Sequence, residues 1–246
     1  MLKTSHLSSA FPLSSCRDAI IELRSPLSYD DDMGRWTVPL IILTNVLVFI
    51  AWTFGSENET QFMVNHFLVS WTSLSEGRLW VLVTSVFSHN MFFHLFMNMY
   101  VLNSFGPIVE AILGARRFLT FYFIAGIFSS LCHATVSAFL LGKPDMPALG
   151  ASGAISGIIL FFSLLFPREK ILLFGFIPMP AFFGALAFIG LDIAGLVAQA
   201  EGGGLPIGHG AHLGGAFAGI VFYFLYRRRL IHQAEKLSDE ETNLPG

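Results

Sequence analysis

The sequence predicts an all-α, polytopic membrane protein: a bundle of six transmembrane helices with both termini in the cytoplasm. The chain of 246 residues is 54% hydrophobic and only 13% charged, about half the charged fraction of a typical soluble domain. Nine of its charged residues lie in residues 1–36 and eight in residues 227–246. The region between them therefore contains apolar runs that are long enough to cross a hydrocarbon core of roughly 30 Å.

The expected spans are apolar runs separated by polar, glycine-containing or proline-containing segments. The first follows an acidic stretch, the fifth follows an apolar segment interrupted by Pro178 and Pro180, and the sixth ends at three consecutive arginines. The six predicted spans are residues 37–54, 91–109, 118–141, 150–166, 181–199 and 211–226. The predicted parts of the chain are a cytoplasmic N-terminal segment (1–36), a membrane domain (37–229) and a charged cytoplasmic tail (230–246).

The distribution of Lys and Arg predicts the orientation, because these residues stay on the cytoplasmic side of a membrane. With the N-terminus inside, the inner segments carry twelve Lys and Arg and the outer segments carry only Arg78 and Lys143. This pattern favours a bacterial inner membrane. The Ser-rich start of the chain weakly resembles a transit peptide, although Asp18 and Glu22 depart from that pattern, so a mitochondrial inner membrane is the alternative.

The first outer loop, residues 55–90, is long for a connection and contains the apolar run LWVLVTSVF at 79–87. Long loops with their own structure are usually functional. We expect this run to lie at the membrane interface, with Trp71 and Trp80 at the depth of the headgroups. The alternative is a second span that starts at residue 79, but Ser88 followed by Asn90 favours a later helix start.

Composition argues against nucleic-acid binding and against cysteine-based sites. A net charge of −3 provides no basic stripe for nucleic acid. The two cysteines, Cys16 and Cys132, lie far apart in different kinds of segment, so neither a disulfide framework nor a cysteine metal site is expected.

Polar side chains inside the predicted spans are candidates for function, because each costs free energy in a membrane. They are His94, Asn98, Ser152, Ser156, Asp192, His209 and His212. With the predicted orientation, the second, fourth and sixth spans all begin at the outer face, and each carries a histidine or a serine in its first turns. We expect these three side chains to lie at one depth, about 3–10 Å below that face.

Ser152 and His212 suit nucleophilic catalysis, because a serine hydroxyl is a weak nucleophile until a base removes its proton. Gly150 precedes the serine at a predicted helix start, where free N–H groups can stabilise an oxyanion. Small residues spaced four apart allow helices to approach closely. They are Gly153 and Gly157 in the fourth span, and Ala211, Gly215 and Gly219 in the sixth.

His94 and Asn98 lie four residues apart and so share one helix face. Directed at Ser152, both could donate hydrogen bonds to an oxyanion. His89 lies about 140° around a helix from His94, so we expect it to have another role.

At these residues the sequence resembles the rhomboid family of intramembrane serine proteases. The pattern H-x4-H-x3-N is present as His89, His94 and Asn98, G-x-S-G as Gly150, Ser152 and Gly153, and A-H-x2-G-x3-G as Ala211, His212, Gly215 and Gly219. The three motifs occur in family order, and the resemblance covers residues 37–229. The segments NMYVLNSF and HGAHLGGA are most similar to the mitochondrial presenilin-associated rhomboid-like branch and its bacterial relatives.

The resemblance implies a rhomboid-like bundle with a Ser–His dyad. Ser152 would attack a peptide bond in or near a substrate's transmembrane helix, and His212 would act as general base and then as general acid. His94, Asn98 and the Ser152 backbone N–H would form the oxyanion hole, with His89 and the motif glycines in support. The resemblance implies no metal and no cofactor, and the partners it implies are transmembrane protein substrates and the lipid bilayer.

Three features depart from the family pattern. Many members carry Trp-Arg in the first outer loop, whereas here Trp80 is followed by Val81 and preceded by Leu79 and Arg78. Many have a tyrosine four residues after the nucleophile that packs on the catalytic histidine, and Ser156 stands at that position. The mitochondrial branch usually has an additional helix before the six transmembrane helices. No such helix is predicted here, which favours a bacterial enzyme.

Other interpretations of the same residues are less favoured. His209 and His212 could be a metal pair, joined by His89 and His94, but no acidic residue lies near them in the motif and HExxH is absent. We expect His209 to be a loop residue near the site. Asp192 could be a third catalytic residue, but the family works with a dyad, so we expect a buried structural aspartate.

Two other classes of function stay open. One is a proteolytically inactive rhomboid-like protein that binds transmembrane helices for quality control or trafficking, although such a protein would be expected to lack the serine or the histidine. The other is a small transporter, which would need inverted repeats and broken helices that the sequence does not display.

Overall fold

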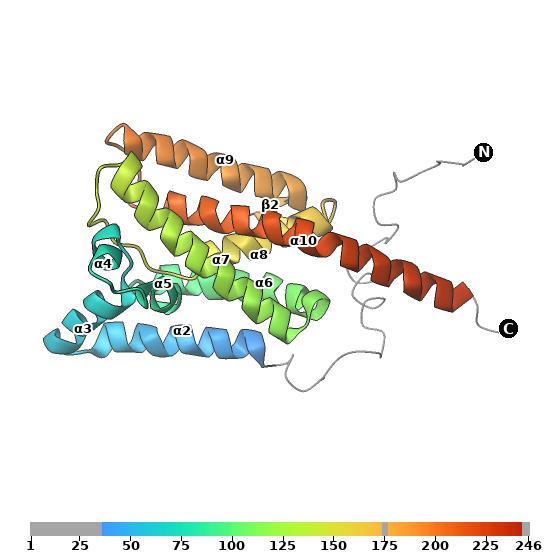
Figure 1. The fold of residues 1–246 in the computed structure, drawn as a ribbon, viewed down its shortest axis with the longest axis horizontal. Helices are drawn as coiled ribbons and strands as arrows, with labels where there is room; N and C mark the ends of the chain where they lie inside the picture. Colours follow the sequence, from blue (N-terminus) through green and yellow to red (C-terminus); the bar gives the residue numbers. More distant parts are fainter. Residues whose placement is uncertain (1–35, 174–176, 243–246) are drawn as a thin grey trace.

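The computed structural model describes residues 36–173 and 177–242, and this part of the chain is mostly helical (Figure 1). The long helices are α2 (Thr37–Phe54), α6 (Phe92–Leu113), α7 (Ala115–Thr135), α8 (Ser152–Leu165), α9 (Ala181–Ala200) and α10 (His209–Thr242). A short antiparallel pair of strands, β1 (Lys170–Leu173) and β2 (Ile177–Pro180), connects α8 to α9. The predicted N-terminal segment lies outside the described residues, apart from Trp36.

Helix α8 forms the interior of the bundle, while α2 and α9 lie on opposite sides of it (Figure 1). Ten of the 14 residues of α8 are buried, against four of 20 in α9. Aromatic side chains of α7, α8 and α10 make much of the core, with Phe121 stacked on Phe222 at a centroid distance of 4.2 Å. A fully enclosed helix is apolar all round, which explains why α8 has no polar face.

The chain is an integral membrane protein. Among the described residues, four helical segments are long and apolar enough to span a membrane: Thr37–Phe54, Phe92–Leu113, Ala115–Leu140 and Ala181–Ala200. Large apolar side chains are exposed along these helices, as expected for surfaces that face lipid. The other two predicted spans correspond to the shorter α8 and to α10, whose first turns are rich in histidine and glycine. Six spans and the orientation remain predictions.

The predicted bounds of the spans agree with the ends of several helices and differ from the ends of others. Helix α2 coincides with the first predicted span, and α8 and α9 agree with theirs to within two residues. Helix α7 continues as one π-helical segment, η2 (Val136–Leu140). Helix α10 extends through the arginines to Thr242, because charged residues end an apolar span without ending a helix. The predicted tail is thus helical over most of its length.

The segment predicted to be the first outer loop contains four short helices: α3 (Glu57–Phe67), α4 (Trp71–Ser75), α5 (Val81–Thr84) and η1 (Ser85–Phe87). The alternative second span beginning at residue 79 is wrong, because the backbone is extended at Ser88. The predicted helix start at Ser88 and Asn90 is also wrong. Helix α6 begins at Phe92, and its N-cap residue, Met91, makes no side-chain cap.

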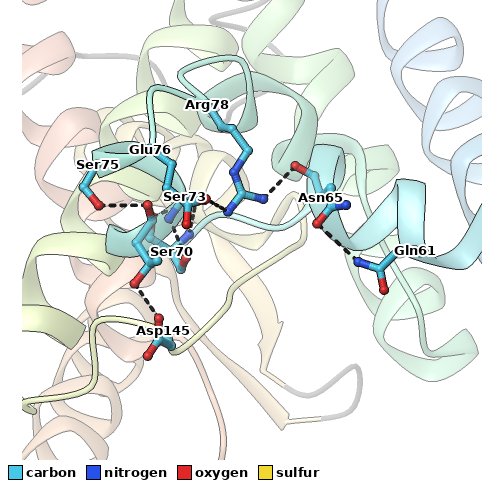
Figure 2. A network of polar contacts seen from close by, with 9 residues as sticks. Gln61, Asn65, Ser70, Ser73, Ser75, Glu76, Arg78 and Asp145 are labelled. Carbon is cyan, nitrogen blue, oxygen red and sulfur yellow. Dashed lines mark hydrogen bonds and ion pairs between the residues drawn. The ribbon is translucent and has the colours of Figure 1, made fainter.

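This outer loop is folded on itself and attached to the segment that precedes α8. Figure 2 shows the network around Arg78, whose guanidinium binds the Asn65 carbonyl oxygen at 3.2 Å and pairs with Glu76. Backbone hydrogen bonds of 3.0 and 2.8 Å join Val69 to Ala148. The outer loop therefore holds the approach to α8 in place.

Candidate active site

The side chains of Ser152 and His212 meet at the starts of two helices. Ser152 is the first residue of α8 and His212 is the fourth of α10. Ser152 Oγ lies 2.9 Å from His212 Nε2, within the reach needed between a nucleophile and its base. The Ser152 N–H belongs to the first turn of α8, where backbone donors have no partner within the helix. The sequence expectation for this pair agrees with the geometry.

Glycines bring α8 and α10 close enough for this contact. A Cβ atom on Gly215 would lie 1.8 Å from the Gly153 carbonyl oxygen, and one on Gly219 would lie 2.4 Å from that of Gly157. The backbones of the two helices therefore touch along this stretch, as small residues in membrane helices permit. Gly153 also faces α7, since its Cβ would overlap the Ser129 hydroxyl. The predicted close approach is present in the structure.

Asp192 is buried and hydrogen-bonded, as expected, and its partners are both histidines at the start of α10. Its Oδ1 is 3.0 Å from His212 Nδ1 and 2.7 Å from His209 Nδ1. The aspartate is 4% exposed, and it comes from α9, which packs against the start of α10. His209 is the first residue of α10 and is buried, where we expected a loop residue. Ser152, His212 and Asp192 thus form a continuous hydrogen-bonded chain.

The α9 residues that contact His209 and His212 lie on one face of the helix. Phe188 packs its ring near His212, with centroids 5.6 Å apart, and a Cβ on Gly195 would overlap the His209 ring at 2.2 Å. Together with Asp192 these residues have the i, i+4, i+7 spacing of one helix face. The aromatic support for His212 therefore comes from Phe188. Ser156 is buried and donates to the Ser152 carbonyl oxygen at 2.7 Å.

His94 and Asn98, the predicted oxyanion donors, differ in the groups that they contact. The His94 ring packs against Gly150, where a Cβ would come within 2.7 Å of it and where φ is +120°, so only glycine fits. Asn98 is buried, and its amide donates to the His94 carbonyl oxygen at 2.8 Å within α6. One amide hydrogen of Asn98 stays available for another acceptor. His94 thus lies against the segment that leads to Ser152, whereas the described bond of Asn98 is to its own helix.

His89 and His133 hold the segment that precedes the serine. The Ala151 N–H donates to His89 Nε2 at 3.5 Å, and His133 Nε2 lies 3.1 Å from the Met146 carbonyl oxygen. His89 is fully buried, and burial lowers its pKa to about 3, with a further contribution from His94. His89 is therefore neutral near pH 7, as an acceptor from a backbone N–H must be.

Asp192, His209 and His212 are also the group that could hold a metal ion, with ligand atoms within 4.8 Å of one another. The sequence motif has no acidic residue near these histidines, but Asp192 of α9 lies beside them in space. The distances from Asp192 Oδ1 to the two Nδ1 atoms are those of hydrogen bonds. In this geometry both histidine donors are already directed at the carboxylate.

Phe188 and Gly195 were not singled out from the sequence, and Asp192 and His209 were given no catalytic role. Two spacings could have connected them: Phe188, Asp192 and Gly195 on one helix face, and His209 three residues before His212. No pattern in the sequence states that these two faces meet.

Comparisons with known proteins agree with this architecture. The family model of the Rhomboid domain matches residues 76–229. RHOMBOID-like protein 12, mitochondrial, of Arabidopsis thaliana is 33% identical over 76% of this chain and 57% of its own length. Human Presenilin-associated rhomboid-like protein, mitochondrial, is 35% identical over 80% of this chain and 50% of its own length. Rhomboid protein 1, mitochondrial, of Saccharomyces cerevisiae is 35% identical over 63% of this chain and 44% of its own length. The chain thus spans about half the length of these curated relatives.

Proposed function

The chain belongs to the rhomboid family, and we propose that it is an intramembrane serine endopeptidase that hydrolyses peptide bonds in or near the transmembrane helices of membrane-protein substrates. The observation that carries this proposal is the 2.9 Å contact between Ser152 Oγ and His212 Nε2. It joins two helix starts that are 60 residues apart in the chain, in a membrane where unpaired polar groups are costly.

The proposed reaction begins with attack of Ser152 Oγ on the scissile carbonyl carbon. The Ser152 proton moves to His212 Nε2, and the imidazolium then gives it to the leaving amine. A water molecule, activated by the same nitrogen, hydrolyses the acyl-enzyme and restores the serine. The Ser152 N–H at the start of α8 stabilises the tetrahedral oxyanion, with His94 and Asn98 as the proposed additional donors.

Labelling with a fluorophosphonate, which reacts with activated serines, tests the proposal without a known substrate. In detergent, we expect the wild-type protein to be labelled and Ser152→Ala and His212→Ala to lose labelling while keeping their helix content by circular dichroism. Ser163→Ala is the matched control, since Ser163 is a buried serine of the same helix with no hydrogen-bond partner for its hydroxyl in the described structure. Absence of labelling in a folded wild-type protein would favour an inactive protein that binds transmembrane helices.

We propose that the protein lies in a mitochondrial membrane rather than in a bacterial inner membrane. The support is the word mitochondrial in the names of the relatives. The orientation with both termini on the inner side and the division into residues 1–36, 37–229 and 230–246 belong to the same proposal. Labelling of single cysteines placed at residues 78 and 228 with a membrane-impermeant reagent tests the orientation, since only the first is expected to react from outside.

A further inference from the structure

We propose that Asp192 is a positioning residue for His212 and that His209 in turn positions Asp192. The active site would then be a Ser–His–Asp chain with a second histidine on its carboxylate. This inference rests on the proposed function, and it names two residues beyond the Ser–His dyad that the family resemblance implies.

The ability of His212 to act as a base depends on its tautomer. To accept the Ser152 proton, Nε2 must carry no hydrogen, so the hydrogen of a neutral imidazole must be on Nδ1. Asp192 Oδ1, 3.0 Å from His212 Nδ1, accepts that hydrogen. The carboxylate therefore selects the tautomer that can act as a base, and it holds the ring in the plane that directs Nε2 at Ser152.

The Asp192 carboxylate is itself held in one orientation. His209 Nδ1 reaches the same oxygen, Oδ1, at 2.7 Å, whereas Oδ2 is buried and makes no hydrogen bond in the described structure. Two donors from successive turns of α10 thus fix one oxygen of a side chain that comes from α9. The room for the His209 ring is made by Gly195, because any Cβ there would overlap it.

Asp192 also affects His212 during the reaction. When Ser152 attacks, its proton moves to His212 Nε2, and the resulting imidazolium lies next to the Asp192 carboxylate, which stabilises it. The His209 hydrogen bond withdraws charge from the same oxygen and so moderates this effect. Removing Asp192 and removing His209 should therefore change the protonation of His212 in opposite directions.

The titratable side chains near His212, other than residues 192 and 209, are the same in all the variants described below. Two of these, His94 on α6 and His133 on α7, lie close enough to His212 to interact with it electrostatically, and both are unchanged in the variants at positions 192 and 209. A difference in pH profile between wild type and a variant at position 192 or 209 thus reports on the altered residue.

The experiment measures the rate of fluorophosphonate labelling of Ser152 in detergent as a function of pH. The acid limb of this profile reports protonation of the base in the free enzyme. For Asp192→Asn we expect labelling slower by about tenfold to a thousandfold and an acid limb moved to lower pH by about one unit, because a favourable negative charge is lost.

The two variants at position 209 form a matched pair. His209→Phe keeps a ring against Gly195 but removes the donor, and we expect its acid limb to move to higher pH by roughly half a unit. His209→Asn keeps a donor at the place of Nδ1, and we expect it to restore the wild-type position of the limb. Helix content is measured for every variant.

An unchanged acid limb in folded Asp192→Asn would overturn the role of Asp192. If that variant does not fold, identical limbs for His209→Phe and His209→Asn would overturn the proposal by themselves, because a merely structural His209 changes the amount of folded protein and not the pH profile. Absence of labelling in the wild-type protein would instead contradict the proposed function.

Discussion

The two sides of His212 are built in different ways. On one side, α8 and α10 touch through their glycine backbones, and α8 is almost entirely buried. On the other side lies α9, a peripheral helix with only four buried residues, one of which is Asp192. Ser152 and His212, the proposed nucleophile and base, therefore lie at a close-packed helix crossing, whereas the α9 side chains that contact His212 come from a helix whose other faces are exposed.

This difference indicates that the two sides contribute in different ways. The crossing of α8 and α10 sets the distance between Ser152 and His212 through backbone contact, which cannot relax by turning a side chain. The α9 side acts through a ring and a carboxylate, which affect the orientation and charge of His212. Disrupting the crossing should thus cost much more activity than trimming an aromatic side chain of α9.

Among substitutions that leave every titratable group of the site in place, the largest effect is expected from Gly215→Ala. The added methyl carbon would lie 1.8 Å from the Gly153 carbonyl oxygen, so α8 and α10 must separate by more than about 1 Å to restore an ordinary contact. A displacement of that size in a catalytic pair costs about a hundredfold in rate. The rate of fluorophosphonate labelling in detergent measures the loss.

Gly190→Ala is the control for this substitution, because Gly190 lies on α9 and a Cβ there meets nothing within 4 Å. We expect wild-type labelling and slightly higher stability, since alanine favours a helix interior. Equal labelling rates for the two variants would contradict the view that backbone contact sets the site.

A smaller effect is expected from Phe188→Ala on α9. The change removes the ring 5.6 Å from that of His212, and contacts of this kind contribute about 0.5–1.5 kcal/mol. We expect labelling to be slower by about threefold to tenfold, with no loss of helix content. Phe183→Ala, which trims a ring that is 61% exposed on the same helix, should leave the rate unchanged, and an equal loss in both would refute a specific contact.

The smallest effect on activity near neutral pH is expected from His89→Gln. This substitution should instead change how the stability of the protein decreases in acid. Burial lowers the pKa of His89 to about 3 in the folded protein, whereas the unfolded chain binds the proton below about pH 6.5. The contribution of His89 to stability is thus complete above pH 6.5 and falls as the pH decreases toward 3, by at most about 1.4 kcal/mol per pH unit.

The glutamine introduced by this substitution does not titrate, and its side-chain carbonyl offers an acceptor near the place of Nε2. The variant should therefore lose less stability in acid than the wild-type protein. Thermal unfolding in detergent between pH 7 and pH 4 measures the difference. Parallel curves for the two proteins would show that His89 does not stay neutral when the protein is folded.

Most of the helices and the pairing of Ser152 with His212 were predictable from the sequence. Apolar length defined the spans, and the glycine spacing in the fourth and sixth predicted the close approach. The end of α10 was not predictable in this way, because the hydropathy signal stops at the arginines although the helix continues. The four short helices of the outer loop were also missed, since each is too short to give a periodic pattern.

The sequence by itself determined that this is a membrane protein with a serine and a histidine at the starts of two closely packed helices. These properties depend on composition and on spacing within single segments, which can be read along the chain. Only the tertiary structure decided that Asp192 and Phe188 contact His212. Their helix, α9, is placed by packing against α8 and α10, and contacts between separate helices depend on how each one is rotated and inclined, which no local pattern records.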